Sequence, residues 1–373
     1  MDTKIFRFGA LLAAGMALAV LAVLAARPAA AQAMEDPVVR GEYLASVAGC
    51  LNCHTPLQAA YNNPETLTLD QIKTLSMREE DAADTTRLLA GGRVFPLGPA
   101  GIVISANITP DMETGIGSWT NDEIKTAIRT GLRPDGRVLF PLMPYPVYNS
   151  MDEHDLDAIV AYLRSVPAVV NPISKEGQVS TEGMPSLPLV SGVAPDPADE
   201  AAYGKYLVNS VLACTDCHTP VDPSTGAPIF EKFLGGGQPF EGPWGIVYGG
   251  NITPDETTGL GAWSEADIKR VLVSGIRPDG RRVIVMPWQG YSNLNAADMD
   301  AVVAYLRNGV PAVTNEVPAT SVNPDIAEII PLPTPEPEAA AQGASLNTWI
   351  IVGVGVAVLA IILFFATRRK KES

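Results

Sequence analysis

Histidine, aromatic residues and basic residues are all scarce in this chain of 373 residues. It contains three histidines, its aromatic content is 6%, and 26 Lys and Arg residues face 41 Asp and Glu residues, for a formal net charge of −15. So acidic a chain does not attract a phosphate backbone, and we predict no nucleic acid partner. Proline and glycine are abundant, at 32 and 33 residues, which predicts many loops.

The two ends of the chain resemble targeting segments. Lys4 and Arg7 precede an apolar run and a small-residue cleavage site, which predicts a cleaved signal peptide at residues 1–33. Near the other end, residues 349–366 are uncharged and RRKK follows at 368–371. As a helix these 18 residues would be about 27 Å long, close to the thickness of a bilayer core. The pattern predicts a single-pass protein of the cell membrane, with a cytoplasmic C-terminus and the rest of the chain on the periplasmic side.

The middle of the chain contains one unit twice. NITPD occurs at 107–111 and 251–255, and RPDGR occurs at 133–137 and 277–281. Matches in the same order predict two copies of one structural unit, each followed by a linker with little periodicity. The predicted organisation is a signal peptide at 1–33, domain 1 at 34–170, a linker at 171–198, domain 2 at 199–315, a Pro-rich linker at 316–345, a transmembrane helix at 346–367 and a basic tail at 368–373.

Within each copy the pattern is helical. Apolar residues recur at helical spacing in 152–166 and 295–309, behind an Asp or Asn that suits a helix N-terminus. Segments 120–131 and 264–275 begin with Thr or Ser and end in Gly, as capped helices do. No segment predicts a strand ladder, so the expected fold class is mainly α. Extra polar residues within 58–90 of the first copy predict a surface excursion, with a partner-binding element as the alternative.

All four cysteines lie in two similar motifs, CLNCHTP at 50–56 and CTDCHTP at 214–220. Cys-x-x-Cys-His is the attachment motif of c-type haem, in which two thiols bind one porphyrin and the His reaches the iron. A thioredoxin-like site would not need the His, a zinc site would distribute its ligands differently, and two disulfides would not explain the repeated motif. We therefore predict two covalently bound haem c groups, attached at Cys50 and Cys53 and at Cys214 and Cys217, with iron ligands His54 and His218.

Each haem iron needs a sixth ligand. Met143 in LMPYPVY and Met286 in VMPWQGY follow the two RPDGR runs at matching places, and a thioether is a known haem ligand. Other methionines are not matched between the copies, so Met143 and Met286 are the predicted axial ligands. The third histidine, His154, aligns with Ala297 and is expected to be exposed.

With these motifs the chain resembles class I c-type cytochromes in tandem. It is most similar to the cytochrome c subunits of membrane-bound bacterial alcohol and gluconate dehydrogenases, which carry runs like GGRVFPLGPAGIVISANITPDMETGIGSWT and RTGLRPDGRVLFPLMPY. The resemblance covers residues 36–170 and 199–315 and implies two cytochrome c domains, each with a haem in an apolar helical shell. Those subunits resemble three-haem chains, whereas two motifs are present here. In such domains Asn107 and Asn251 either contact the haem propionates or stabilise a turn.

A haem iron that binds His on one face and Met on the other has no open coordination position, which favours electron transfer over catalysis. The chain is predicted to be a membrane-anchored dihaem cytochrome c that transfers electrons between a quinol- or substrate-oxidising complex and a terminal acceptor. The alternative is a subunit fixed within a dehydrogenase or cytochrome bc complex, and a dihaem peroxidase fits less well. The predicted partners are redox proteins, namely a membrane dehydrogenase or bc-type complex and a terminal oxidase or reductase.

Overall fold

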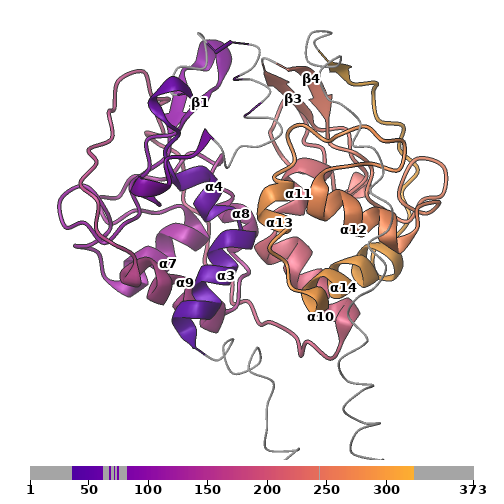
Figure 1. Ribbon diagram of the computed structural model, residues 1–373, viewed down its shortest axis with the longest axis horizontal. Helices are drawn as coiled ribbons and strands as arrows, with labels where there is room; N and C mark the ends of the chain where they lie inside the picture. The colour runs from indigo at the N-terminus through magenta and orange to yellow at the C-terminus, as the bar shows by residue number, and fades with distance from the viewer. Residues whose placement is uncertain are drawn as a thin grey trace, which may run out of the picture. The chain divides into compact units, whose positions relative to one another are not determined.

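The computed structural model describes residues 36–61, 67, 68, 71, 74, 82–242 and 244–322, and its elements follow the same order in the two copies (Figure 1). The first copy contains α3 (Pro37–Val47), α4 (Cys50–His54), η1 (Ala59–Tyr61), η3 (Thr85–Arg87), β1 (Val94–Pro96), η4 (Gly98–Ala100), β2 (Ile102–Ile104), α7 (Asn121–Thr130), α8 (Tyr145–Tyr148) and α9 (Glu153–Ser165). The second contains α10 (Glu200–Tyr206), the π-helical turn η5 (Leu207–Val211), α11 (Cys214–His218), η6 (Phe230–Lys232), β3 (Pro239–Gly242), β4 (Gly245–Tyr248), α12 (Glu265–Ser274), α13 (Trp288–Tyr291), α14 (Ala296–Ala304), the π-helical turn η7 (Tyr305–Gly309) and β5 (Ser321–Val322).

The capped helices predicted from the sequence are confirmed. At the start of α7, the Glu123 amide donates to Thr120 Oγ1 at 3.2 Å and the Thr120 amide donates to Glu123 Oε2 at 2.6 Å, which forms a capping box. Gly131 ends α7 at a φ of +74°, in the left-handed region that favours glycine. Helix α12 has the same arrangement, with Ser264 as its N-cap and Gly275 at its end.

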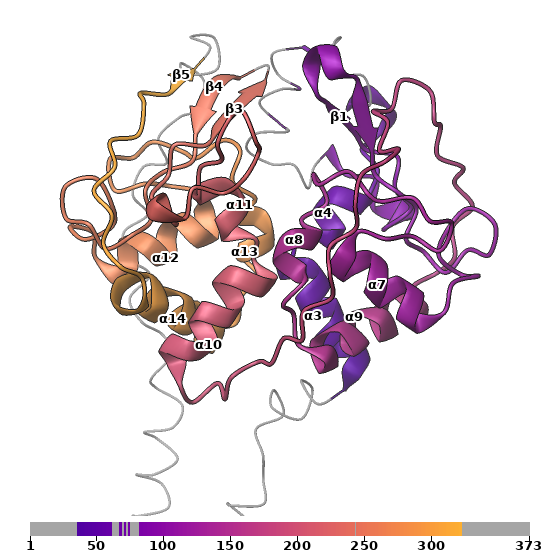
Figure 2. The same ribbon diagram turned by 180° about the vertical axis from the view of Figure 1, so that it is seen from behind.

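The first helix of each copy crosses the last helix at very close range. Helix α3 packs on α9, and α10 packs on α14 (Figure 2). A Cβ atom at Gly41 would lie 1.9 Å from the carbonyl oxygen of Ala158, and one at Gly204 would lie 1.9 Å from that of Ala301. Only glycine allows these backbones to touch, so both crossings depend on it.

Two small sheets correct the expectation of a mainly α fold. Strands β1 and β2 are antiparallel, with Val94 opposite Ile104. Strands β3, β4 and β5 form a second antiparallel sheet, in which Ile246 of β4 lies opposite Ser321. The strands have two to four residues, too short for an alternating pattern to be recognised in the sequence.

The predicted single-pass membrane location and transmembrane helix are also corrected. In the part of the chain that the structure describes, no helix is long and apolar enough to cross a membrane. Helix α9, with 13 residues, would be about 20 Å long, whereas a bilayer core is about 30 Å thick. The predicted signal peptide at 1–33, the helix at 346–367 and the tail at 368–373 lie outside the described residues, as does most of 62–81.

Candidate haem sites

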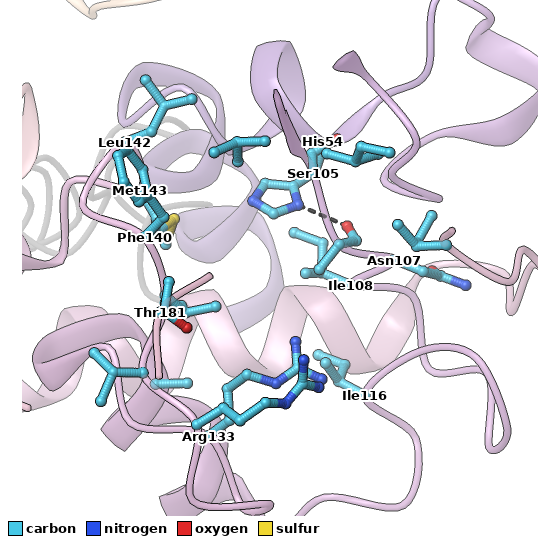
Figure 3. A pocket seen from close by; sticks show the side chains of 18 of the residues that line it. His54, Ser105, Asn107, Ile108, Ile116, Arg133, Phe140, Leu142, Met143 and Thr181 are labelled. Carbon is cyan, nitrogen blue, oxygen red and sulfur yellow. Dashed lines mark hydrogen bonds between the residues drawn. The ribbon is translucent and has the colours of Figure 1, made fainter. Parts of the chain in front are cut away.

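A cavity of about 950 Å³ lies in the first copy, within the size range of pockets that hold cofactors. Cys50, Cys53, His54, Asn107 and Met143 all line this cavity, and Figure 3 shows His54, Asn107 and Met143 around it. The rest of its wall is largely apolar and includes isoleucine, leucine, phenylalanine and tryptophan side chains. The structure thus brings together every residue that the sequence predicted for the first haem.

One hydrogen bond orients the histidine of each motif. His54 Nδ1 lies 2.8 Å from the carbonyl oxygen of Ala106, and His218 Nδ1 lies 2.7 Å from that of Gly250. Because a carbonyl oxygen only accepts, Nδ1 carries the proton and Nε2 keeps its lone pair for a metal. Burial lowers the pKa of both rings, which favours the neutral form that binds iron.

A glycine next to each histidine makes this contact possible. The Gly91 amide donates to the His54 carbonyl oxygen at 2.6 Å, and the Gly236 amide donates to that of His218 at 2.7 Å. Gly91 has a φ of +69°, and a Cβ atom there would lie 2.3 Å from the carbonyl carbon of Ala106. Gly91, in a GG pair, and Gly236, in a GGG run, therefore let the segment with the accepting carbonyl reach the histidine. The repeated run of glycines was the signal in the sequence.

The cysteines occur as thiols rather than as disulfides. Burial raises the pKa of Cys50, Cys214 and Cys217 to about 12, so these thiols are protonated at neutral pH. A thioredoxin-like or zinc-binding thiol would need a lowered pKa. Between the cysteines, the second motif has Asp216 where the first has Asn52, and burial raises the pKa of Asp216 to about 6.

The two predicted methionine ligands occupy equivalent turns and pack against the hydrophobic core. The Tyr145 amide donates to the Met143 carbonyl oxygen at 2.7 Å, and the Trp288 amide donates to that of Met286 at 2.8 Å. In Figure 3, the edge of the His54 ring opposite its hydrogen bond faces the side of the cavity where Met143 lies. Their roles as iron ligands stay predictions. By contrast, the side chain of His154 is 95% exposed, as expected.

The side-chain amides of Asn107 and Asn251 are buried and form hydrogen bonds within their own copies. Asn107 Nδ2 donates to Thr114 Oγ1 at 3.0 Å and to the Val169 carbonyl oxygen at 2.8 Å, and its Oδ1 accepts from the amide and hydroxyl of Thr109. Asn251 forms the same set. These bonds stabilise a turn, which was one of the two predicted roles, and a propionate contact stays a prediction.

Sequence reasoning missed one pair of cavity residues, the first arginine of each RPDGR run. The Arg133 guanidinium lies 5.2 Å from the centre of the Trp119 ring and reaches into the cavity (Figure 3), and Arg277 lies 5.4 Å from that of Trp263. Both Nε atoms are buried without a hydrogen-bond acceptor among the described residues. Each Nε lies 3.6 Å from a carboxylate oxygen, that of Asp135 or of Asp279, and in the first copy Arg133 brings a cation to the cavity wall. The repetition of the arginine was the signal available.

Part of the predicted linker at 171–198 forms a wall of the first cavity. The Ile102 amide donates to the Gly177 carbonyl oxygen at 3.0 Å, and the Val179 amide donates to that of Ile102 at 2.9 Å. These backbone bonds hold Thr181 and Met184 at the cavity. In the second copy, Ile246 is equivalent to Ile102, and it pairs with Ser321 of strand β5.

Comparisons with known proteins agree with this geometry, although no protein-family model matches. The chain is 32% identical over 320 residues to the cytochrome c subunit of the quinone alcohol dehydrogenase of Gluconobacter oxydans, covering 80% of this chain and 59% of the relative. It is 29% identical over 300 residues to the fructose dehydrogenase cytochrome subunit of Gluconobacter japonicus, covering 76% and 55%. It is 29% identical over 329 residues to a diheme cytochrome c-type protein of Cereibacter sphaeroides, covering 81% and 98%.

The chain is therefore similar to c-type cytochromes. More particularly, its relatives are cytochrome c subunits of bacterial alcohol, fructose and gluconate dehydrogenases together with a dihaem cytochrome, which confirms the resemblance predicted from the motifs. The chain spans 59% and 55% of the length of the alcohol and fructose dehydrogenase subunits that it matches.

Proposed function

We propose that this chain is a dihaem c-type cytochrome that transfers electrons within a dehydrogenase complex. The observation that carries the proposal is the cavity of the first copy, which gathers the side chains of Cys50, Cys53 and Met143 and a neutral His54 whose Nδ1 is held by a carbonyl oxygen. The relatives named as cytochrome subunits of dehydrogenases support the same role, because such subunits carry electrons and leave substrate oxidation to another subunit.

The residues of each copy suit one haem. In the first copy, Cys50 and Cys53 would hold the porphyrin through thioether bonds, with His54 and Met143 on the two faces of the iron. Bound haem supplies an iron that takes up and releases one electron. The largely apolar wall would surround the porphyrin, and Arg133, which lines the cavity beside its ion-pair partner Asp135, would supply a cation for an anionic propionate. The second copy would use Cys214, Cys217, His218 and Met286.

Two full coordination spheres leave no position for a substrate, so the chain exchanges electrons with protein partners. We propose that the donor is the catalytic subunit of a membrane dehydrogenase, because the relatives are subunits of such enzymes. A bc-type complex is the other candidate donor, and the acceptor is a terminal oxidase or reductase. The acidic balance of the chain favours a basic docking surface on the partner.

The proposal is tested on protein produced with c-type haem maturation. We expect the intact mass to include two haems, and Met143→Ala or Met286→Ala each to remove sulfur coordination from one iron and lower one reduction potential. Met112→Ala is the control, because Met112 is 65% exposed. A protein with fewer than two haems, or methionine variants with both potentials unchanged, would contradict the proposal.

A further inference from the structure

The two copies exchange a matched pair of hydrogen bonds. The Tyr43 hydroxyl in α3 donates to Asp298 Oδ2 in α14 at 2.5 Å, and the Tyr206 hydroxyl in α10 donates to Asp155 Oδ2 in α9 at 2.6 Å. The two tyrosines occupy the same place in the repeat, and so do the two aspartates. The tyrosine of each copy therefore donates a hydrogen bond to the aspartate of the other copy, which is the reciprocal pattern of a two-fold dimer interface.

Other contacts follow the same reciprocal pattern. The Tyr43 oxygen accepts from Asn295 Nδ2 at 3.1 Å, and the Tyr206 oxygen accepts from the Asp152 amide at 3.1 Å, where Asn295 and Asp152 are equivalent. Helix α13 of the second copy contacts α3 of the first, and α8 of the first contacts η5 of the second. Equivalent elements of the two copies therefore form the interface between them, rather than one isolated contact.

The two carboxylates depend on these donors because both are buried. Asp155 is 2% exposed and Asp298 is 6% exposed. A buried carboxylate without donors is costly, so each tyrosine hydroxyl stabilises the contact strongly. Arg40 also donates from Nε to Asp155 at 2.7 Å, whereas the equivalent position in the second copy is Tyr203.

The contact between the copies reaches the haem motifs. A methyl group at Gly290 in α13 would lie 3.5 Å from Oδ1 of Asn52, which is inside the first motif. On each side a tyrosine also holds the residue two positions before the first cysteine. Tyr148 donates to the Ala48 carbonyl oxygen at 2.5 Å, and Tyr291 donates to that of Leu212 at 2.8 Å. A movement between the copies would therefore change the distance between the two motifs.

We propose that the reciprocal exchange of Tyr43 with Asp298 and of Tyr206 with Asp155 fixes the two haem domains as one rigid pair, so that electrons pass between the haems within the chain. The inference rests on the proposed function and adds the partner of each haem, which is the other haem of the same chain. The four residues are positioning residues, because they act through the geometry of the pair.

The test replaces both tyrosines with phenylalanine, which removes two hydroxyls and keeps the rings. Each lost bond to a carboxylate should reduce the docked population about tenfold or more. We expect pulsed EPR of the oxidised protein to show a narrow distribution of iron–iron distances in the wild type and a broad one in Tyr43→Phe/Tyr206→Phe. Electron exchange between the haems after flash reduction should slow at least tenfold, while the visible spectrum stays unchanged.

Tyr305→Phe is the matched control, because Tyr305 is buried like Tyr206 and its hydroxyl accepts from Asn209 Nδ2 at 3.3 Å within the second copy. The control should keep the narrow distances and the fast exchange. A double variant that behaves like the control overturns the inference. If the double variant does not fold, Tyr43→Phe alone is measured against the same control. A wild-type chain without two haems contradicts the proposed function instead, so the two failures are distinguishable.

Discussion

A methyl group at Gly41 or Gly204 should loosen the helix crossing that supports one haem motif. In each copy the crossing glycine lies on the helix that runs into the Cys-x-x-Cys-His motif, and the helix it meets is the last of the copy. Gly41→Ala should therefore affect the first haem, and Gly204→Ala should affect the second. The two substitutions test equivalent positions of one fold within a single chain.

The size of the effect follows from the distances. The added Cβ at Gly41 would lie 1.9 Å from the Ala158 carbonyl oxygen and 2.8 Å from Tyr162 Cβ, whereas ordinary contact begins near 3.4 Å. The helices must separate by about 1.5 Å, because the nearest atom belongs to the backbone. Overpacking of this kind costs about 1–3 kcal/mol. The better helix propensity of alanine returns up to about 1 kcal/mol. With a steric cost of about 3 kcal/mol, we expect the free energy of unfolding to fall by about 2 kcal/mol.

The assay is thermal unfolding of the haem-loaded protein, together with the reduction potential of each haem. A loss of about 2 kcal/mol should lower the Tm by about 3 °C, because an unfolding entropy of about 2.1 cal/mol/K per residue amounts to about 0.8 kcal/mol/K over 373 residues. Glu42→Ala is the control, because it adds alanine to the same helix at an exposed position. If Gly41→Ala matched the stability of this control, the steric reasoning would be refuted.

Two further predictions concern charge. Asp111 and Asp255 accept hydrogen bonds from Thr114 and from Thr314 and Thr258, and these bonds hold both pKa values below the usual range. The stabilisation is complete above the unfolded pKa of about 3.9 and is lost as the pH falls through the folded pKa. The double variant Asp111→Asn/Asp255→Asn should therefore lose less Tm than the wild type between about pH 5 and pH 3. An unchanged slope of Tm against pH would contradict this. Asp216→Asn should raise one of the two reduction potentials at pH 8, because a carboxylate near a haem stabilises the oxidised iron, and redox titration showing both potentials unchanged would reject it.

The sequence predicted the parts of the fold that depend on local signals. Helices α7 and α12 have an N-cap, an amphipathic face and a terminal glycine within twelve residues, so their ends were predictable. The first haem site was predictable because its motif and its methionine are individually recognisable. The structure adds that both line one cavity.

The remainder depends on contacts that leave little trace in the sequence. The carbonyl oxygen that accepts from His54 belongs to Ala106, and every residue type has this backbone atom, as Gly250 shows in the second copy. The wall segment at 177–179 binds Ile102 through backbone groups alone, so its composition suggested a linker. Strand β5 pairs with β4 across more than 70 residues, and such non-local pairing is not encoded in a short pattern.

The repeat separates what both haems need from what distinguishes them. The histidine–carbonyl bond, the close glycine, the buried asparagine and the arginine over tryptophan occur in both copies, so they belong to the shared scaffold of the two candidate haem sites. The differences lie at the motifs and between the copies, where Asn52 corresponds to Asp216 and Arg40 corresponds to Tyr203. Arg40 is paired with Asp155, so the unmatched charge at a motif is the carboxyl group of Asp216 in the second copy. Charge near a haem sets its potential, so under the proposed function a nearly symmetric pair acquires two unequal potentials at one fixed spacing. Unequal potentials at a fixed spacing give electron transfer through the chain a direction.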